Sequence, residues 1–295
     1  MRKFNTEILK KLYTPPSDSH KGQNGKLLLI GGSKIFHAAS LWSLKVASRI
    51  VDMVFYSSVP ENNQIVQKAK QEFRDGIVVS RNKIEDYINE ADCILIGPGL
   101  PRKEGEDEGD DDTKLLTEKL LKKYSHKKWV IDGGSLQVIS PDILPQNSII
   151  TPHQREFEML FKSQIQPFGF AQGENTKSQI NLNDQISEIQ NEVSRMAKKY
   201  KCVILFKGET DIVCDKHECV IVEGGNAGMT KGGTGDVLAG LVAALYCKNE
   251  AFLSACSASF INKKAGESLH KRVGPYFNSS DLVDEIPKVM KELIF

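Results

Sequence analysis

Residues 226–240 read Asn-Ala-Gly-Met-Thr-Lys-Gly-Gly-Thr-Gly-Asp-Val-Leu-Ala-Gly and lead into the apolar run Leu-Val-Ala-Ala-Leu at 241–245. The glycines precede a helical pattern that opens at Asp236, so backbone N–H groups are left bare at a helix N-terminus, where the helix dipole favours an anion. A carboxylate at an anion site repels the ligand unless it takes a proton from the group that attacks a phosphate. Asp236 is therefore a candidate catalytic base; the alternative is an N-cap on a glycine-rich turn.

The composition is that of an ordinary globular protein, with 40% hydrophobic and 26% charged residues. The 295 residues are enough for one large α/β domain or two smaller ones. The 39 Lys and Arg residues nearly balance the 38 Asp and Glu residues, so no global field attracts nucleic acid or an anionic membrane. We therefore expect a small-molecule partner, and neither nucleic acid nor a membrane.

The N-terminus and the cysteines bear on the compartment. The first residues lack an apolar segment, and no apolar run approaches the roughly 18 residues that a membrane-spanning helix needs. The cysteines are scattered, several of them within apolar runs, and no Cys-x-x-Cys pair occurs. We expect buried free thiols, rather than disulfides or a metal site, at Cys93, Cys202, Cys214, Cys219, Cys247 and Cys256. Free thiols in turn predict that the protein lies in a reducing, cytoplasmic compartment.

Short apolar strands that end in glycine turns recur along the chain. The first, at residues 26–32, precedes a helical pattern at 38–51, which predicts a βαβ unit of a parallel sheet covered on both faces. Segments at 212–215 and 220–222 flank a turn and predict an antiparallel hairpin bordering that sheet. Later parallel strands end in the turns Gly97-Pro98-Gly99, Asp132-Gly133, Thr151-Pro152-His153 and Lys207-Gly208, and carboxyl ends of parallel strands are where such sheets bind ligands.

No shift in composition divides the chain and no repeat of solenoid period occurs, so residues 1–295 are expected to form a single domain. Residues 1–24 are predicted to form a polar N-terminal lead. The polar, glycine-containing residues 162–181 are predicted to be a mobile surface insertion. The acidic run at 104–112 is expected to be a solvated loop rather than a metal site, because blocks of like charge repel.

The order of these turns resembles the ribokinase-like superfamily. More narrowly, residues 20–290 are similar to the ATP- or ADP-dependent NAD(P)H-hydrate dehydratase family, a carbohydrate-kinase-like domain. The specific motifs are Thr151-Pro-His153 followed by Glu156, and the stretch from Gly225 that leads into Gly-Gly-Thr-Gly-Asp-Val-Leu-Ala-Gly. His20-Lys-Gly-x-x-Gly25, Ile30-Gly-Gly-Ser33, Gly97-Pro-Gly-Leu100 and Lys207-Gly208 support them. The resemblance implies a three-layer α/β/α fold with a mainly parallel central sheet and a small antiparallel hairpin at one edge.

The resemblance also implies a reaction. The terminal phosphoryl of ATP or ADP, with Mg²⁺, would pass to the hydroxyl of (S)-NAD(P)H hydrate and leave as phosphate, giving NAD(P)H, with Asp236 as the base on that hydroxyl. No Mg²⁺ ligand can be assigned from the sequence. The implied nucleotide contacts are Lys207, Gly208, Glu209, Thr210, Asp211, Gly233, Thr234 and Gly235, the last three through backbone amides. The implied substrate contacts are Ala39, Gly99, His153, Asn226 and Asp236.

Simpler roles remain open for some of these residues: a surface lysine for Lys207, a capping residue for His153 and a turn-fixing amide for Asn226. Several departures from the family pattern lie at the substrate end: Phe36-His37-Ala38-Ala39 stands where Tyr-x-Gly-Ala is usual, Pro101 replaces a glycine, and Gly134 replaces an acid.

Two other functions therefore stay open: a kinase of a small vitamin precursor, and a nucleotide-binding protein without turnover. The choices of ATP or ADP and of NADHX or NADPHX are also open. The family implies a homo-oligomer, and epimerase activity is expected on a separate chain.

Overall fold

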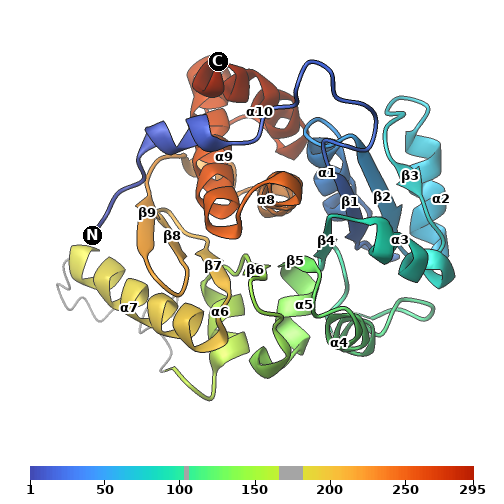
Figure 1. Cartoon of the computed structure of the whole chain (residues 1–295), viewed down its shortest axis with the longest axis horizontal. Helices are drawn as coiled ribbons and strands as arrows, with labels where there is room; N and C mark the ends of the chain where they lie inside the picture. Colours follow the sequence, from blue (N-terminus) through green and yellow to red (C-terminus); the bar gives the residue numbers. More distant parts are fainter. Residues whose placement is uncertain (103–105, 166–181) are drawn as a thin grey trace.

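The computed structural model describes residues 1–102, 106–165 and 182–295. Within them the backbone forms a sheet in the strand order β3-β2-β1-β4-β5-β6-β7-β8-β9 (Figure 1). Neighbours from β3 to β7 are parallel, whereas β7, β8 and β9 pair antiparallel, which confirms the predicted hairpin at one edge. The strands are β1 Lys26–Ile30, β2 Met53–Ser57, β3 Ile77–Val78, β4 Cys93–Ile96, β5 Lys128–Ile131, β6 Ile149–Ile150, β7 Val203–Phe206, β8 Asp211–Cys214 and β9 Cys219–Val222.

Helices cover both faces of this sheet (Figure 1). One layer holds α1 His37–Ala47, α2 Pro60–Ala69, α8 Thr234–Lys248, α9 Ala251–Val273 and α10 Ser279–Ile294. The other holds α3 Ile84–Glu90, α4 Thr113–Lys123, α5 Gly133–Val138, α6 Gln154–Phe161 and α7 Leu182–Tyr200. Short 3-10 helices are η1 Thr6–Lys11, η2 Arg81–Lys83, η4 Pro141–Ile143 and η5 Ala227–Thr230. The predicted three-layer α/β/α fold is confirmed.

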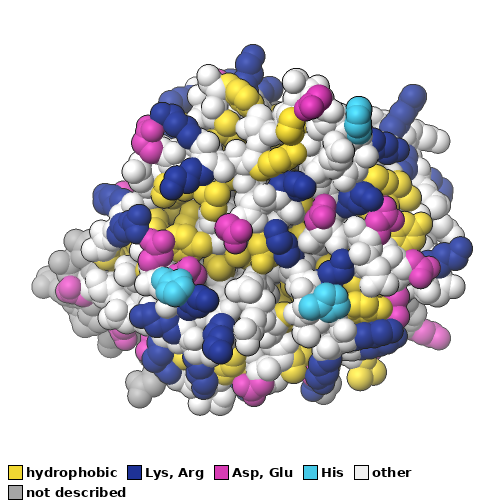
Figure 2. Space-filling view, viewed as in Figure 1, with side chains coloured by type: hydrophobic (Ala, Val, Ile, Leu, Met, Phe, Trp, Pro, Cys, Tyr) yellow, Lys and Arg dark blue, Asp and Glu magenta, His cyan; other side chains and the backbone are white. Residues whose placement is uncertain are grey.

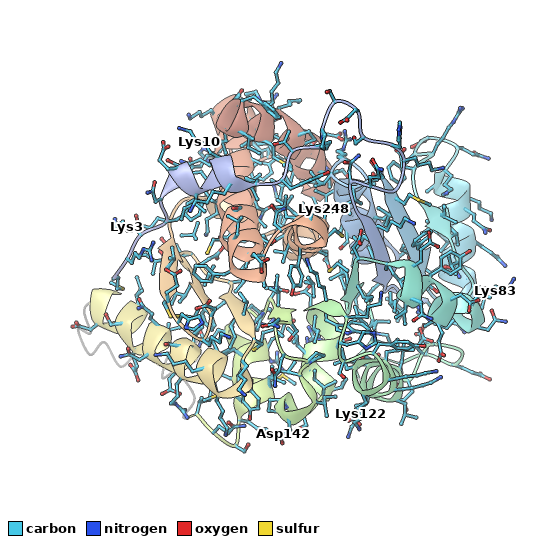
Figure 3. All side chains as sticks on the ribbon, viewed as in Figure 1. Lys3, Lys10, Lys83, Lys122, Asp142 and Lys248 are labelled. Carbon is cyan, nitrogen blue, oxygen red and sulfur yellow. A yellow bond between two sulfur atoms is a disulfide. The ribbon has the colours of Figure 1, made fainter. Side chains whose placement is uncertain are left out.

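Strand β1 illustrates why its sequence reads as a continuous apolar run. Successive side chains of a strand point to opposite faces. Leu27 and Leu29 belong to the core beneath α1 and α8, whereas Leu28 and Ile30 belong to the core beneath α3 and α4. All four are fully buried, so neither face of the strand tolerates a polar residue. Side chains fill the space between the sheet and each helical layer (Figure 3).

Two element boundaries differ from the sequence predictions. Helix α8 begins at Thr234 rather than at Asp236, because the left-handed Gly233 (φ 97°) is its N-cap. Asp236 is thus the third helical residue and not the N-cap. Residues 133–138, predicted only as a turn after a strand, form α5, which opens on two glycines and so carries no strong helix signal.

The N-terminal lead, residues 1–24, packs partly against the core although its composition is polar. Leu9 and Leu12 are buried in the core that α8 and α9 share. The backbone at Arg2 and Phe4 exchanges hydrogen bonds with Ile221, so the chain start lies beside β9, as Lys3 does in Figure 3. Of the predicted mobile insertion, residues 166–181 lie outside the described residues.

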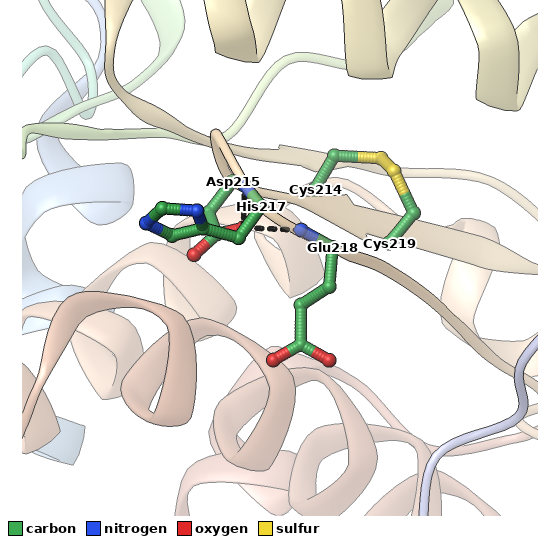
Figure 4. Close-up of a disulfide and its surroundings, with 5 residues drawn as sticks. All are labelled: Cys214, Asp215, His217, Glu218 and Cys219. Atoms are coloured by element: carbon green, nitrogen blue, oxygen red, sulfur yellow. Dashed lines mark hydrogen bonds between the residues drawn. A yellow bond between two sulfur atoms is a disulfide. The ribbon is translucent and has the colours of Figure 1, made fainter.

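The cysteine prediction is wrong for one pair. Cys214 and Cys219 form a disulfide across the turn between β8 and β9 (Figure 4). The strands pair these two residues directly, with their Cα atoms 4.1 Å apart, a distance that antiparallel register imposes whatever the compartment. The remaining cysteines, Cys93, Cys202, Cys247 and Cys256, are free and buried as expected.

The acidic loop is also more than a solvated segment over its described part. Arg81 pairs with Asp111, and each side chain is only 17% exposed. The backbone N–H of Lys34 donates to Asp110 at 2.9 Å. The loop is therefore tied to the turn that follows β1. Elsewhere the acidic and basic side chains are interspersed over the visible face of the molecule (Figure 2).

Candidate active site

Sheet hydrogen bonding continues one residue past several strands, and it aligns the polar residues that directly follow them. The N–H of Asp132, after β5, donates to Ile96, and the N–H of Thr151, after β6, donates to Ile131. The N–H of Lys207, after β7, donates to Pro152 at 2.8 Å. The side chains of Asp132, Thr151 and Lys207 are thereby brought together at the carboxyl edge of the sheet, the edge predicted to bind ligands.

Gly97 allows the chain after β4 to lie close to Asp132 after β5. Its φ is 123°, and a Cβ at this position would lie 1.7 Å from the carbonyl oxygen of Asp132. Any side chain here would push the chain away from Asp132. The Gly-Pro-Gly turn after β4 is therefore required by packing against the next strand end.

A single ammonium group links two carboxylates in this cluster. Lys207 Nζ lies 2.8 Å from Asp132 Oδ1 and 3.8 Å from Glu156 Oε2. Thr151 Oγ1 also donates to Asp132 Oδ1, at 2.7 Å. Burial alone would lower the pKa of Lys207, but Asp132 and Glu156 outweigh it and the pKa is raised. Lys207 is therefore charged, and it is not the surface lysine considered as its alternative.

Asp236 carries the perturbed carboxyl of the site. Burial, together with the negative charges of Asp132 and Glu156, raises its pKa to about 7, against the opposing effect of Lys207. A carboxyl that changes charge near neutral pH is suited to take and release a proton. Asp236 lies in the first turn of α8, whose backbone is fixed to α1 by a 2.7 Å hydrogen bond from Ser43 Oγ to the Asp236 carbonyl.

The first turn of α8 leaves its backbone amides without a side-chain cap. Gly233 supplies no capping group, and a Cβ on it would lie 2.2 Å from the Trp42 ring, so the loop passes too close for another residue. The Thr234 hydroxyl is used within the loop, donating to Met229 and Lys231 carbonyls. A Cβ on Gly235 would lie 3.6 Å from Lys207 Nζ, so an anion at this helix end would meet both groups.

His153 has the capping role that was one of its two predicted alternatives. It is the N-cap of α6, its Nδ1 accepts a hydrogen bond from the Glu156 N–H, and Glu156 caps in return. Burial is the main cause of a lowered His153 pKa, so the ring is neutral near pH 7. Its side chain is still 46% exposed, which leaves the ring free to contact a ligand as well.

A cavity of about 870 Å³ opens beside this cluster, between the β7–β8 turn, the β9–η5 loop, α8 and α9. Its size fits a nucleotide-sized ligand. The predicted nucleotide contacts that line it are Lys207, Gly208, Glu209, Thr210, Asp211, Thr234 and Gly235. Gly233 does not line it and acts through the shape of the loop instead.

The walls of the cavity are held by a residue that the sequence reasoning missed. Lys263 Nζ, on α9, donates to the carbonyls of Gly208 (3.2 Å), Glu209 (2.9 Å) and Gly224 (3.4 Å). It also lies 3.4 Å from Asp211 Oδ1, and both side chains are almost fully buried. Lys263 therefore ties the two loops together. The sequence carries little signal for it, because the polar Asn262 and Lys264 stand on either side of Lys263.

The Asp211 carboxylate is engaged in internal hydrogen bonds and an ion pair that hold the wall of the cavity. Its carboxylate accepts from the Gly208 N–H at 2.9 Å and from Ser259 Oγ at 2.7 Å, besides pairing with Lys263. Burial raises its pKa against these opposing interactions. Its predicted role as a nucleotide contact therefore becomes that of a residue that fixes the Lys207–Thr210 turn.

The predicted substrate contacts fall into two groups. Ala39 and Gly99 lie together, since a Cβ on Gly99 would lie 3.1 Å from the Ala39 Cβ. Asn226, by contrast, lines the cavity with the nucleotide candidates. Its amide is used internally, accepting from the Gly228 N–H and donating to the Gly266 carbonyl, so it has the turn-fixing role considered above.

The described ranges contain neither a cluster of metal ligands nor a membrane-spanning helix. No group of three or more His, Cys, Asp or Glu residues is placed there to hold a metal ion. The same residues contain no helix long and apolar enough to cross a bilayer. The carboxylates of Asp132 and Glu156 lie 2.8 Å and 3.8 Å from Lys207 Nζ.

Comparison with known proteins agrees with this geometry. A family model described as NAD(P)H-hydrate dehydratase matches residues 27–288. A bifunctional NAD(P)H-hydrate repair enzyme of Methanocaldococcus jannaschii is 37% identical, covering 96% of this chain and 51% of that protein. An ADP-dependent (S)-NAD(P)H-hydrate dehydratase of Nitrosopumilus maritimus is 33% identical, covering 98% of this chain and 97% of that protein.

The solved structure of a ribokinase-like superfamily protein from Enterococcus faecalis is 22% identical, with a TM-score of 0.78. It covers 99% of this chain and 96% of that chain, which confirms the ribokinase-like fold. The chain spans about half the length of the bifunctional relatives that it matches. Taken together, the matched motifs, the sheet topology and the family model show that the chain belongs to the NAD(P)H-hydrate dehydratase family.

Proposed function

We propose that this chain dehydrates (S)-NAD(P)H hydrate to NAD(P)H at the expense of ADP or ATP. The observation that carries the proposal is Asp236, a carboxyl with a pKa of about 7 in the first turn of α8, beside the half-buried Lys207 and the cavity. A base of this pKa next to a cation and bare amides suits phosphoryl transfer to a hydroxyl.

The first chemical step is transfer of the terminal phosphoryl. Asp236 takes the proton of the hydrate hydroxyl as that oxygen bonds to the terminal phosphorus, and the bond from phosphorus to the nucleotide's bridging oxygen breaks. Lys207 and the N–H group of Gly235, in the first turn of α8, stabilise the negative charge that spreads over the phosphoryl oxygens. AMP or ADP leaves.

The second step is elimination. The carbon–oxygen bond of the phosphorylated hydrate breaks, inorganic phosphate leaves, and a proton leaves the neighbouring carbon to form the double bond of NAD(P)H. Phosphate is a far better leaving group than hydroxide, which explains why a dehydration would consume a nucleotide. We place the substrate ring on the side of Ala39, Gly99 and His153, and the nucleotide in the 870 Å³ cavity.

Mg²⁺ is part of the proposal as the ion that accompanies the nucleotide. Mg²⁺ is usually held by substrate phosphates, water and one or two carboxylates rather than by a complete protein cage. Asp132 and Glu156 fit that pattern, because they present carboxylates beside Lys207 at the edge of the site. When bound, the ion would neutralise charge on the phosphates.

Product analysis tests the function. Purified protein would be incubated with NADHX or NADPHX and either ADP or ATP, and the absorbance of reduced nicotinamide and the release of phosphate would be followed together. We expect both to rise in equal amounts, and neither to rise with Asp236→Asn. Phosphorylation of another small alcohol without return of absorbance would instead identify a kinase, and nucleotide binding without either product would identify a non-catalytic protein.

The domain organisation, cellular location and oligomeric state of the protein are part of the same proposal. We propose that residues 1–295 form a single domain and that the protein is a cytoplasmic homo-oligomer. The Cys214–Cys219 disulfide removes the support that free thiols alone would have given to a reducing compartment. Light scattering after size-exclusion chromatography measures the oligomer, and a monomer at working concentration would contradict that part.

A further inference from the structure

Asn262 has an unused hydrogen-bond acceptor at the nucleotide cavity. The residue lies on α9, is 4% exposed and lines the 870 Å³ cavity. Among the residues that the structure describes, its Oδ1 atom is fully buried and has no hydrogen-bond partner. Buried amide oxygens nearly always accept a hydrogen bond, so an orphan in a cavity wall points to a ligand that supplies the donor.

Three other polar side chains that line the same cavity already have internal partners. Lys263 donates to three carbonyls, and Asp211 accepts from Gly208 and Ser259. Asn226 uses both ends of its amide. Asn262 therefore stands apart from these neighbours as a group left for the ligand.

The position of Asn262 indicates which part of a nucleotide it meets. Lys207 and Gly235 mark the phosphate end, at the start of α8. Leu238, one turn farther along α8, and Met229 line the same cavity as Asn262, so its wall is partly apolar. A carbonyl oxygen repels phosphate, and apolar walls favour a flat base. The base end of the nucleotide is therefore the part expected at Asn262.

Helix geometry agrees with this placement. Gly266 follows Asn262 by four residues, so both lie on one face of α9. Gly266 meets the Met229 sulfur, which a Cβ would approach to 2.3 Å, and its carbonyl accepts from Asn226. The face that carries Asn262 is thus the one that η5 covers, at the inner wall of the cavity.

We propose that Asn262 is a specificity-determining residue whose Oδ1 accepts a hydrogen bond from the 6-amino group of adenine in the bound nucleotide. Asparagine pairs with adenine through its amide, taking the 6-amino group as donor and giving its own N–H to a ring nitrogen. A 6-oxo purine offers an acceptor in that place and leaves Oδ1 unsatisfied. The proposal rests on the nucleotide site of the proposed function and names the base that this site selects.

Direct binding tests the proposal without turnover. Calorimetry would compare ADP, inosine diphosphate, purine riboside diphosphate and 2′-deoxy-ADP on the wild type and on Asn262→Leu, which has a similar volume and no polar atoms. We expect the wild type to bind ADP about 10- to 100-fold more tightly than the two purines that lack the amino group. Asn262→Leu should lose that preference, with 2′-deoxy-ADP following ADP in both proteins.

The controls separate this role from a structural one. Asn89→Leu, at an exposed asparagine of α3, should keep the wild-type preference. Asn262→Asp retains the acceptor, so it should still prefer ADP over purine riboside diphosphate, and it serves if the leucine variant does not fold. Equal binding of ADP and inosine diphosphate by the wild type, or a preference kept by Asn262→Leu, overturns the proposal. A base preference without NADHX turnover would instead count against the proposed function alone.

Discussion

Lys207 Nζ donates a 2.8 Å hydrogen bond to Asp132 Oδ1, joining the residue after β7 to the residue after β5. The strand between them, β6, leads to His153 and Glu156, and Glu156 lies 3.8 Å from the same ammonium. One cation therefore faces two carboxylates, and Asp236 feels all three charges. Burial, together with the excess of negative over positive charge, raises the pKa of Asp236, which makes this carboxyl a base near neutrality.

Asp236→Asn removes the proposed base and is expected to lower kcat by about 100- to 10,000-fold while leaving nucleotide affinity intact. Steady-state rates with NADHX and calorimetry with ADP measure the two effects. Asp75→Asn, an exposed aspartate, is the matched control and should change neither. A kcat within threefold of the wild type would remove Asp236 from the mechanism.

The same substitution should stabilise the protein. The folded pKa of about 7 lies above the usual aspartate pKa of 3.8, so the folded state binds more protons and stability falls as pH rises between about 4 and 7. Asparagine has no such penalty. Asp236→Asn should therefore raise Tm by more at pH 8 than at pH 5, as measured by calorimetry. An equal effect at both pH values would mean that Asp236 has an ordinary pKa.

Glu156→Gln tests the electrostatic origin of the Asp236 pKa. For the wild type, kcat/KM should rise with pH through about 7, as Asp236 loses its proton, and then level off. Glutamine keeps the capping geometry with His153 but removes one of the charges that raise the Asp236 pKa, so the rise should move to lower pH. Coincident pH profiles for the two proteins would mean that Glu156 does not contribute to the raised pKa, and would leave burial and Asp132 as its causes.

The fold could be predicted because its signals are local. Several parallel strands, such as β1 and β4, are apolar on both faces and end in a glycine turn, and this pattern lies within a few residues of sequence. The start of α8 was misplaced by two residues because the left-handed Gly233, rather than a capping side chain, opens it. The two glycines of α5 hid a helix for a similar reason.

The site was harder to predict because its decisive contacts join distant residues. Lys207 was named from its place after a strand, but its pairing with Asp132 depends on which strands are neighbours. Lys263 and Asn262 reach the cavity from α9, over 50 residues after the Lys207 turn, and no spacing rule connects them. The disulfide escaped because the hairpin register, not the number of cysteines, brings Cys214 opposite Cys219.

The disulfide should contribute to stability without affecting turnover. It closes a loop of six residues, for which chain entropy gives about 2 kcal/mol. The turn lies at the end of the hairpin opposite to Asp211 and Glu223, which line the cavity. Replacing both cysteines by serine should lower Tm by a few degrees and leave kcat unchanged. Dithiothreitol should lower the wild-type Tm to the same value and leave the variant unaffected, and a loss of activity would contradict this assignment.

Lys263→Met should weaken ADP binding and destabilise the fold at once. Asp211 would be left as a buried charge without its cation, which costs about 3–5 kcal/mol, and the Gly208, Glu209 and Gly224 carbonyls would lose their donor. Thermal unfolding measures the loss of stability, and calorimetry with ADP measures the loss of affinity. Lys264→Met, at the neighbouring and more exposed lysine, is the matched control and should change neither by much.

Adding Asp211→Asn to Lys263→Met separates the two roles of Lys263. The double variant removes both charges while an asparagine oxygen can still accept from the Gly208 N–H, so much of the lost stability should return. The three carbonyls still lack their donor, so the loops that wall the cavity remain untied and the weak ADP binding should persist. If the double variant recovers stability and ADP affinity together, Lys263 only balances the charge of Asp211 and does not position the nucleotide loops.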